Sequence, residues 1–207
     1  MAASVDGYVA VHDGQTDSER HNQGFSNEAD WQNLLNLIKS CDAVILGSQT
    51  LQAGGGVIDQ TRDDGSWPIW VTLTNRGIPE EHEFWDQTEA QRWLVSEKDL
   101  DLPKNKDLST IKNLVYHEKN VVSFILENLK SVGCKRVLLL GGGRINQMFY
   151  QAEAVQELIL TVCPLLVARE GAVPIVSPGL ETLVKFRLLS SRTEQDLVFL
   201  HYEINKN

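Results

Sequence analysis

Continuous apolar runs that end at glycine mark the buried strands of this chain. Residues 43–46 (Ala-Val-Ile-Leu) and 137–140 (Val-Leu-Leu-Leu) contain no polar position, and they end at Gly47 and Gly141. A strand that helices cover on both faces has such a run, whereas a half-exposed strand alternates apolar and polar side chains. We therefore expect both segments to be parallel strands in the interior of a sheet.

A helical apolar pattern precedes each of these runs. Residues 27–39 place four apolar side chains at helical spacing, with Ser26 or Asn27 as the expected N-cap. Residues 121–131 gather apolar side chains on one side, and Gly133 follows as a stop signal. The order of helix, strand and glycine turn thus occurs twice, which is typical of α/β proteins.

The middle and the end of the chain predict shorter strands. Val198, Leu200 and Tyr202 alternate with Phe199 and His201, which indicates a strand with two different faces. No helical pattern separates this strand from the one before it, so the two predict an antiparallel hairpin at a sheet edge. Strands are expected at residues 69–73, 92–96, 114–117, 158–167, 183–189 and 197–204, and loops at 12–24, 52–67 and 97–110.

Composition and charge favour one globular domain over residues 1–207 in the cytoplasm. The 207 residues are 42% hydrophobic and 23% charged, which is enough apolar material for one core. The net charge of -9 opposes binding to nucleic acid and to anionic membranes, and no apolar run is long enough to span a bilayer. The N-terminus has no signal-peptide pattern. Cys41, Cys134 and Cys163 lack metal-ligand spacing, so we expect buried thiols in a reducing compartment and no metal site.

The strongest candidate for a ligand site is the glycine turn after the second buried strand. Glycine allows the backbone to approach a ligand closely, and the first N–H groups of a helix have no partners, so this turn favours a bound phosphate. A tight strand-to-helix turn without a ligand is the alternative. Asparagine stands where the dinucleotide fingerprint has its third glycine, so we do not expect a standard Rossmann domain. The candidate residues are Gly141, Gly142, Gly143, Arg144, Ile145 and Asn146.

Two further turns follow expected strands and carry groups that suit a nucleotide. Gly47, Ser48 and Thr50 supply backbone and hydroxyl donors for a second phosphate, although helix capping by Ser48 explains the same residues. Thr74 and Arg76 follow the strand at 69–73, and a cation there suits the 2'-phosphate that distinguishes NADP from NAD. A solvated loop arginine is the alternative at this turn.

Two carboxylates are candidates for acid–base chemistry. Asp6 lies in the turn Ser4-Val-Asp-Gly7 after a short first strand, and Glu157 begins the expected strand near residue 158. Each has a structural alternative, because aspartate before glycine favours turns and a carboxylate at a strand start suits a sheet edge. The sequence does not choose between these alternatives.

These motifs, in this order, resemble the reductase domain of bifunctional riboflavin-biosynthesis proteins, the RibD C-terminal family. The resemblance extends over almost the whole chain and is carried by residues 2–7, 41–50, 138–146, 155–166 and 198–202. It implies a dihydrofolate-reductase-like α/β fold in three layers. In that fold a mainly parallel mixed sheet has helices on both faces and ends in a C-terminal antiparallel hairpin.

The resemblance also implies a function. The hydride donor would be NADPH, and the substrate a ribosylamino-pyrimidine 5'-phosphate that is reduced to its ribitylamino form by a homodimer. Residues 47–50 and 141–146 would contact the cofactor phosphates, and 74–76 would lie near the adenosine. Ser4, Asp6 and Glu157 would face the nicotinamide and the substrate.

One segment departs from the family's pattern. Residues 52–62 lack the acidic pair that the family has after the first glycine turn, and Arg62 is the candidate for the arginine that binds the substrate phosphate. Two other functions therefore stay open. One is a reductase of the same fold for a pterin or another small imine or carbonyl compound, and the other is a nucleotide-binding paralogue without turnover.

Overall fold

The computed structural model describes residues 1–117 and 120–205. The chain divides into two compact units. Unit 1 consists of Met1–Leu34 and Gly142–Asn207, and unit 2 is the continuous segment Leu35–Gly141. Helix α2 (Glu28–Lys39) contains the residues at which the chain passes from unit 1 to unit 2.

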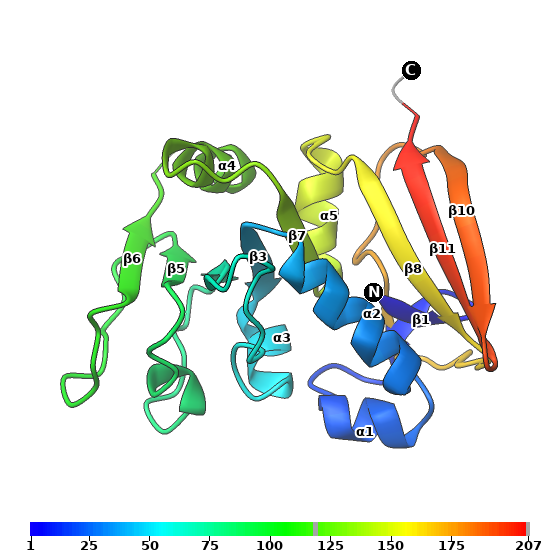
Figure 1. The fold of residues 1–207 in the computed structure, drawn as a ribbon, viewed down its shortest axis with the longest axis horizontal. Helices are drawn as coiled ribbons and strands as arrows, with labels where there is room; N and C mark the ends of the chain where they lie inside the picture. Colours follow the sequence, from blue (N-terminus) through cyan, green and yellow to red (C-terminus); the bar gives the residue numbers. More distant parts are fainter. Residues whose placement is uncertain (118–119, 206–207) are drawn as a thin grey trace. The chain divides into compact units, whose positions relative to one another are not determined.

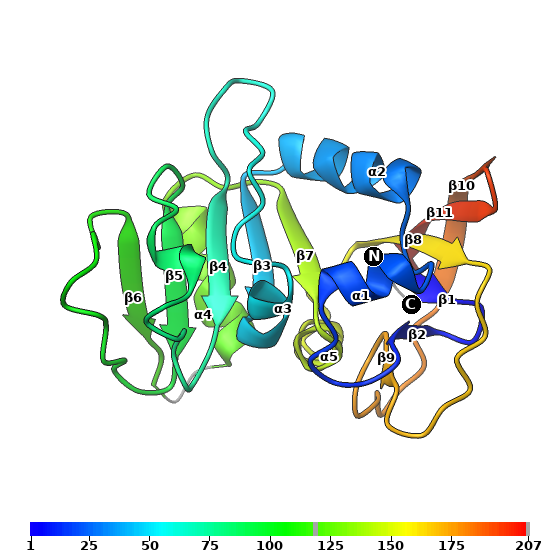
Figure 2. The same ribbon diagram turned by 90° about the horizontal axis from the view of Figure 1, so that it is seen from below.

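Unit 2 is built on a parallel sheet of five strands. The strand order is β6-β5-β4-β3-β7, and every neighbouring pair is parallel. In Figure 2, helix α4 (Val121–Ser131) lies behind these strands and helix α3 (Ser48–Ala53) lies in front of them. The strands are β3 (Ala43–Gly47), β4 (Ile69–Leu73), β5 (Arg92–Ser96), β6 (Ile111–Val115) and β7 (Val137–Gly141).

The apolar runs of the sequence account for the interior of this sheet. Residues Ala43–Leu46 of β3 are all buried, which follows from their position between β4 and β7. The predicted parallel strands at 43–46 and 137–140 are confirmed as hydrogen-bonded neighbours. Of the two, only β3 lies in the interior of the sheet, because β7 is its edge strand and residues 137–140 are only partly buried, contrary to the expectation for this run. The predicted strands at 69–73 and 92–96 are also confirmed as β4 and β5.

Unit 1 contains a four-stranded sheet of mixed direction. The order is β1-β8-β11-β10, in which β1 is parallel to β8 and the other pairs are antiparallel (Figure 1). A small second sheet pairs β2 with β9. The strands are β1 (Ala2–Ser4), β2 (Tyr8–Ala10), β8 (Glu157–Cys163), β9 (Val173–Pro174), β10 (Phe186–Glu194) and β11 (Leu197–Ile204).

The two faces of the four-stranded sheet pack against different helices. Phe199 points to the face where Ala29 of α2 and Cys163 form a buried cluster. Tyr202 has the opposite parity in β11, so it points to the other face. There its ring packs against Phe186, which contacts Tyr150 of helix α5 (Gly143–Gln151). The fold is therefore α/β, mostly parallel, with antiparallel strands at the C-terminus and helices on both faces, as expected.

The structure corrects several local predictions. The segment expected as a loop at 12–24 contains helix α1 (Asp17–Asn22). A capping box between Thr16 and Glu19 stabilises the N-terminus of this helix. Strand β6 is placed at 111–115 instead of 114–117, and β10 at 186–194 instead of 183–189. Pairing with β11 carries β10 through polar residues beyond the apolar ones. The strands also belong to separate hydrogen-bonded sheets instead of one.

The three cysteines differ in burial. Cys41 and Cys163 are buried as expected, whereas Cys134 is partly exposed. Within residues 1–117 and 120–205, no helix combines the length and the apolar character that a membrane crossing requires.

Candidate active site

Three of the predicted turns lie side by side at one edge of the unit 2 sheet. Strands β7, β3 and β4 are adjacent and parallel, so their carboxyl ends lie at the same edge. The register pairs Leu46 with Gly141, and Gly47 with Leu73. The Thr50 hydroxyl donates to the carbonyl oxygen of Gly141 at 3.5 Å. The turns that begin at Gly141, Gly47 and Thr74 are thus brought together, as open α/β sheets do at their ligand sites.

The turn after β4 presents an unpaired cation. The Thr74 amide donates to the carbonyl oxygen of Val95, which ties the turn to β5. The Thr74 hydroxyl donates to the carbonyl oxygen of Gly77 at 3.1 Å and accepts from the amide of Arg76 at 3.2 Å. The Arg76 side chain is exposed and makes no hydrogen bond or ion pair with any described residue. Thr74 therefore shapes the turn, while the Arg76 guanidinium is available to an anion.

Each glycine of the turn 141–143 has a structural cause. Gly141 and Gly142 have φ angles of 90° and 71°, which L side chains rarely adopt. A Cβ on Gly143 would lie 2.9 Å from the carbonyl oxygen of Pro174 and 3.0 Å from the Cβ of Ser177. Backbone geometry and packing in unit 1 thus explain the three glycines without a ligand. Helix α5 begins at the last of them, Gly143, and its N-cap Gly142 provides no side-chain cap, which leaves the first N–H groups of the helix available.

The three residues after the glycines divide into two kinds. Arg144 is exposed and Ile145 is partly buried. Asn146 is only 2% exposed, and its amide nitrogen donates to the carbonyl oxygen of Ile175 at 2.7 Å. Its Oδ1 atom finds no donor among the described residues. The Asn146 side chain therefore fastens α5 to the segment at 175.

The turn after β1 is a closed network of hydrogen bonds around Asp6. The Ser4 hydroxyl donates to Asp6 Oδ1 at 2.6 Å and accepts from the amide of Tyr8 at 2.9 Å. The amides of Val167 and Ala168 also donate to the Asp6 carboxylate, at 3.2 and 2.8 Å. The Ser4 hydroxyl, followed by these two amides, lowers the pKa of Asp6 below its ordinary value. Asp6 is therefore a carboxylate at neutral pH and has no proton to give.

Residues 174–177 join this turn to the start of α5 within unit 1. The amide of Ile175 donates to the carbonyl oxygen of Gly7 at 3.1 Å. The amide of Ser177 donates to the carbonyl oxygen of Gly143 at 3.1 Å, and Asn146 holds Ile175 as described. The candidate residues near Asp6 and those at the start of α5 are thus connected through one short segment, which the sequence alone did not identify.

Glu157 is not part of this group. The parallel register pairs Ser4 with Cys163, the last residue of β8, whereas Glu157 is the first residue of that strand. Six residues of strand separate the two ends, a distance of roughly 20 Å. Glu157 Oε2 lies 2.8 Å from Nε2 of His201 on β11. The structure therefore does not place Asp6 and Glu157 at one reacting group, contrary to the expectation that both face the substrate.

Arg62 also lies apart from the other candidates. Its guanidinium forms an ion pair with Asp42 at 2.7 Å, directly before the amino end of β3. Asp42 also accepts from the amides of Lys135 and Arg136, at 2.7 and 2.9 Å, and these amides are the main cause of its lowered pKa. Arg62 is thus a structural partner at the edge of the sheet opposite to the three turns. The sequence signal for this network was an aspartate directly before a buried strand.

The comparisons with protein families and with solved structures point to the same family. The model of the RibD C-terminal domain matches residues 1–199. Comparison with curated proteins gives no match. Among solved structures, Acinetobacter baumannii RibD has a TM-score of 0.76 at 19% identity, and the match covers 98% of this chain and 56% of RibD. This chain therefore spans a little more than half of the length of that protein.

Two shorter proteins have similar structures. A pyrimidine reductase-like protein from Corynebacterium diphtheriae has a TM-score of 0.77 at 15% identity, with coverage of 99% of this chain and 90% of that protein. The riboflavin biosynthesis reductase Rib7 of Saccharomyces cerevisiae has a TM-score of 0.69 at 14% identity, with coverage of 99% and 87%. These similarities support the fold, and the family match decides the identity: the chain belongs to the RibD C-terminal domain family.

Proposed function

We propose that this chain is an NADPH-dependent reductase of riboflavin biosynthesis that converts a ribosylamino-pyrimidine 5'-phosphate into its ribitylamino form. The observation that carries the proposal is the row of three turns at the carboxyl ends of β7, β3 and β4, with an unpaired arginine in the last turn. Family membership and the similarity to pyrimidine and riboflavin reductases support it. The two units together would make one reductase domain over residues 1–207.

The donors of these turns fit a dinucleotide phosphate. The backbone of Gly47 and the hydroxyls of Ser48 and Thr50 would hold phosphate oxygens, and so would the uncapped N–H groups that follow Gly142. Arg76 would bind the 2'-phosphate, because its guanidinium lacks a partner among the described residues. When bound, NADPH supplies the hydride for the reduction.

Asp6 is the carboxylate that we assign to the substrate side. It is linked through residues 174–177 to the start of α5, whereas Glu157 lies at the far end of β8. Because Asp6 is ionised, it would orient a hydroxyl or N–H group of the substrate by accepting its hydrogen bond. Ser4 keeps the carboxylate in place through its short hydrogen bond.

Two measurements test the proposal. Quenching of the fluorescence of the five tryptophans should report binding of NADPH at much lower concentrations than NADH. Equal affinity for both nucleotides would remove the role of Arg76, and binding of neither would reject a nucleotide site altogether. Loss of NADPH absorbance with the pyrimidine substrate would support the reaction, whereas turnover only with a pterin would change the substrate.

Asp6→Asn separates the assigned role from a purely structural one. The variant keeps the size of the side chain but removes its charge, so we expect a lower kcat and an unchanged NADPH dissociation constant. Unchanged kcat would make Asp6 a turn residue only. Glu157→Gln is the matched comparison, for which we expect activity close to that of the wild type.

A homodimer is also part of the proposal. Strand β10 pairs only with β11 among the described strands, so its outer edge of nine residues offers free backbone groups. Leu188 and Leu189 of this strand are 50% and 41% exposed, and Leu183, three residues before the strand begins, is 93% exposed. A second copy would cover both the edge and the leucines. Light scattering on the purified chain would give the mass of a dimer, and Leu188→Glu should shift it to a monomer.

A further inference from the structure

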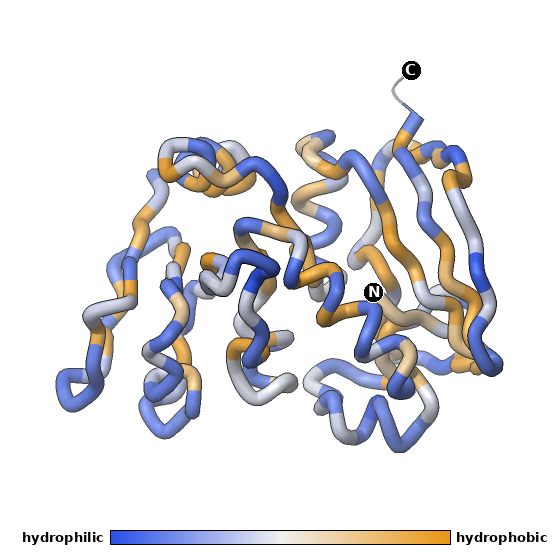
Figure 3. Tube along the Cα trace, viewed as in Figure 1, coloured by the Kyte–Doolittle hydropathy of each residue, from blue (hydrophilic) through white to orange (hydrophobic). Residues whose placement is uncertain are grey.

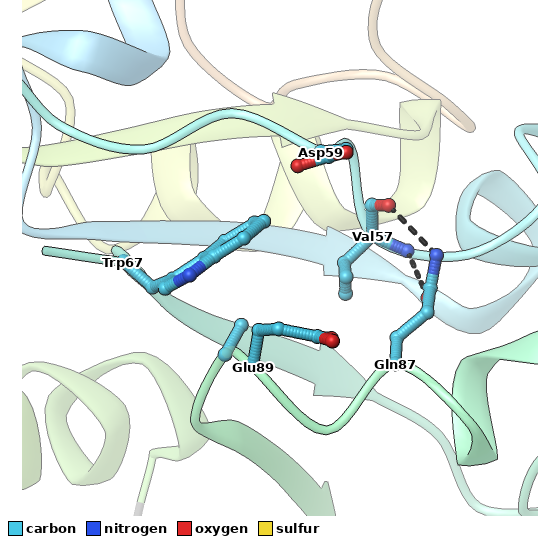
Figure 4. Close-up of a pocket in the computed structure, with 6 residues that line it drawn as sticks. Val57, Asp59, Trp67, Gln87 and Glu89 are labelled. Carbon is cyan, nitrogen blue, oxygen red and sulfur yellow. Dashed lines mark hydrogen bonds between the residues drawn. The ribbon is translucent and has the colours of Figure 1, made fainter. Parts of the chain in front are cut away.

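A cavity of about 240 Å³ lies wholly within unit 2, away from the three turns. Trp67 lies just before the first residue of β4, and Glu89 and Ala90 lie just before the first residue of β5. The amino ends of parallel strands lie at the edge opposite to their carboxyl ends, so this cavity is distinct from the proposed nucleotide site. It is lined by Val57, Asp59, Trp67, Gln87, Glu89 and Ala90 (Figure 4).

Two hydrogen bonds hold the walls of the cavity in place. The amide of Val57 donates to Gln87 Oε1 at 2.8 Å, and Gln87 Nε2 donates to the carbonyl oxygen of Val57 at 3.0 Å. Gly56, with a φ angle of 112°, leaves the space in which the Gln87 side chain lies. The segment that contains Val57 and Asp59 is thereby fastened to the segment before β5. The cavity is formed without a ligand, which reduces the entropic cost of binding.

The chemistry of the lining is anionic and aromatic. Figure 4 shows Asp59 and Glu89 on opposite sides of the space, with the Trp67 indole between them at one end. Neither carboxylate makes a hydrogen bond or an ion pair with a described residue. The charge of Glu89 does act on Arg92, but that guanidinium is buried and is held by the Phe84 carbonyl oxygen and the Thr110 hydroxyl. Two negative charges and an indole face therefore remain for a ligand.

We propose that this cavity binds a small organic cation, an alkylammonium or alkylguanidinium group. The carboxylates would pair with its charge, the indole would supply a cation–π contact, and Val57 and Ala90 would contact its alkyl part. The volume is below the range of about 300–1,000 Å³ of sites for drug-sized ligands, so the ligand is a small amine or one side chain of a larger molecule. This site does not depend on the proposed reductase function.

Nuclear magnetic resonance of the whole chain tests the proposal with n-butylammonium as the probe. The indole N–H signal of Trp67 is identified by its loss in Trp67→Phe. At constant ionic strength, n-butylammonium should shift this signal and leave the other four indole signals in place. We expect Asp59→Asn and Glu89→Gln each to raise the dissociation constant about fivefold, the upper range for exposed ion pairs. The double variant should bind more weakly than either.

The matched controls decide between the cavity and general charge attraction. n-Butanol has the same alkyl chain without the charge, and Glu80→Gln removes an exposed carboxylate of unit 2 that does not line the cavity. An unshifted Trp67 signal would overturn the proposal, as would equal shifts with n-butanol. It would also fail if the double variant bound like the wild type, or if Glu80→Gln weakened binding as much as Glu89→Gln. The four unshifted indole signals show in each variant that the fold is retained.

Discussion

Units 1 and 2 use their polar residues in different ways. In unit 2 the turns at the carboxyl ends leave groups without partners, namely the Arg76 guanidinium and the hydroxyl of Ser48. In unit 1 two candidate side chains are bonded to the protein itself: Asp6 holds Ser4 and two amides, and Asn146 holds Ile175, whereas Arg144 is exposed. Under the proposed function, the free side chains of unit 2 would bind the nucleotide, whereas Asp6 and Asn146 fix backbone turns within unit 1.

The largest effect is expected at Gly142, the N-cap residue of α5. Gly142→Val should raise the NADPH dissociation constant more than about 100-fold, because a branched side chain at a φ of 71° displaces the first N–H groups of α5. Tryptophan fluorescence titration measures the change. Gly133→Val is the control, because Gly133 has a φ of 89° and open space around it. If both variants lose NADPH binding, the loss is due to general destabilisation, and Gly142 has no specific role in binding.

A large effect on stability, and none on binding, is expected at Asp42. Asp42→Ala leaves the amides of Lys135 and Arg136 without their acceptor and removes one of the two ion pairs of Arg62, which should lower the free energy of unfolding by about 2–3 kcal/mol. Arg62→Ala removes two partly exposed ion pairs, with Asp42 and Asp64, and should lower the free energy of unfolding by about 1 kcal/mol or less. Urea unfolding gives both values. If the Arg62→Ala variant instead had normal stability and a raised KM for the substrate, Arg62 would be a substrate-binding residue.

A specific effect on one nucleotide is expected at Arg76. Arg76→Ala should raise the dissociation constant of NADPH about tenfold, because the loss of one charge-assisted hydrogen bond weakens binding by about that factor. The dissociation constant of NADH should stay unchanged. Arg169→Ala in unit 1 removes an exposed arginine of equal charge and serves as the control. Equal weakening of NADPH in the two variants would mean that Arg76 acts only through the overall charge.

The smallest effect is a pH dependence at Asp6. Because the pKa of Asp6 is lowered in the folded chain, its contribution to stability is complete above the ordinary aspartate range. It is lost as the pH falls through the lowered value. Asp6→Asn should therefore be less stable than the wild type at pH 6, and the gap should narrow in acid. Asp101→Asn, at an aspartate without a hydrogen bond or ion pair to a described residue, should give no such narrowing.

The sequence predicted unit 2 better than unit 1 for a physical reason. The strands of a covered parallel sheet carry their signal locally, as the run 43–46 does. Strand β10 was displaced in the prediction because Leu183 and Leu189 are apolar but exposed, and pairing with β11 determines where the strand ends. Helix α1 had a local signal, the capping box of Thr16 and Glu19, that its polar composition obscured.

The sequence was sufficient to find the turns of the candidate site, but not to predict which of its residues lie close together. Glycine, hydroxyl and arginine residues after strands were sufficient to find the turns at Gly47, Thr74 and Gly141. The distance between Asp6 and Glu157 depends on which end of β8 lies beside β1, and the sequence holds no local signal for this register. The same is true of the ion pair between Arg62 and Asp42, because β3, α3 and a loop lie between these two residues in the sequence.

The order of synthesis gives the pairing of β1 with β8 a further consequence. Ala2 lies beside Thr161 in the sheet, so β1 leaves the ribosome long before β8, the strand with which it pairs. Unit 2 is one continuous segment and can complete its sheet meanwhile. Closing so long a loop is slow, so we expect the pairing of β1 with β8 to be a late step in folding.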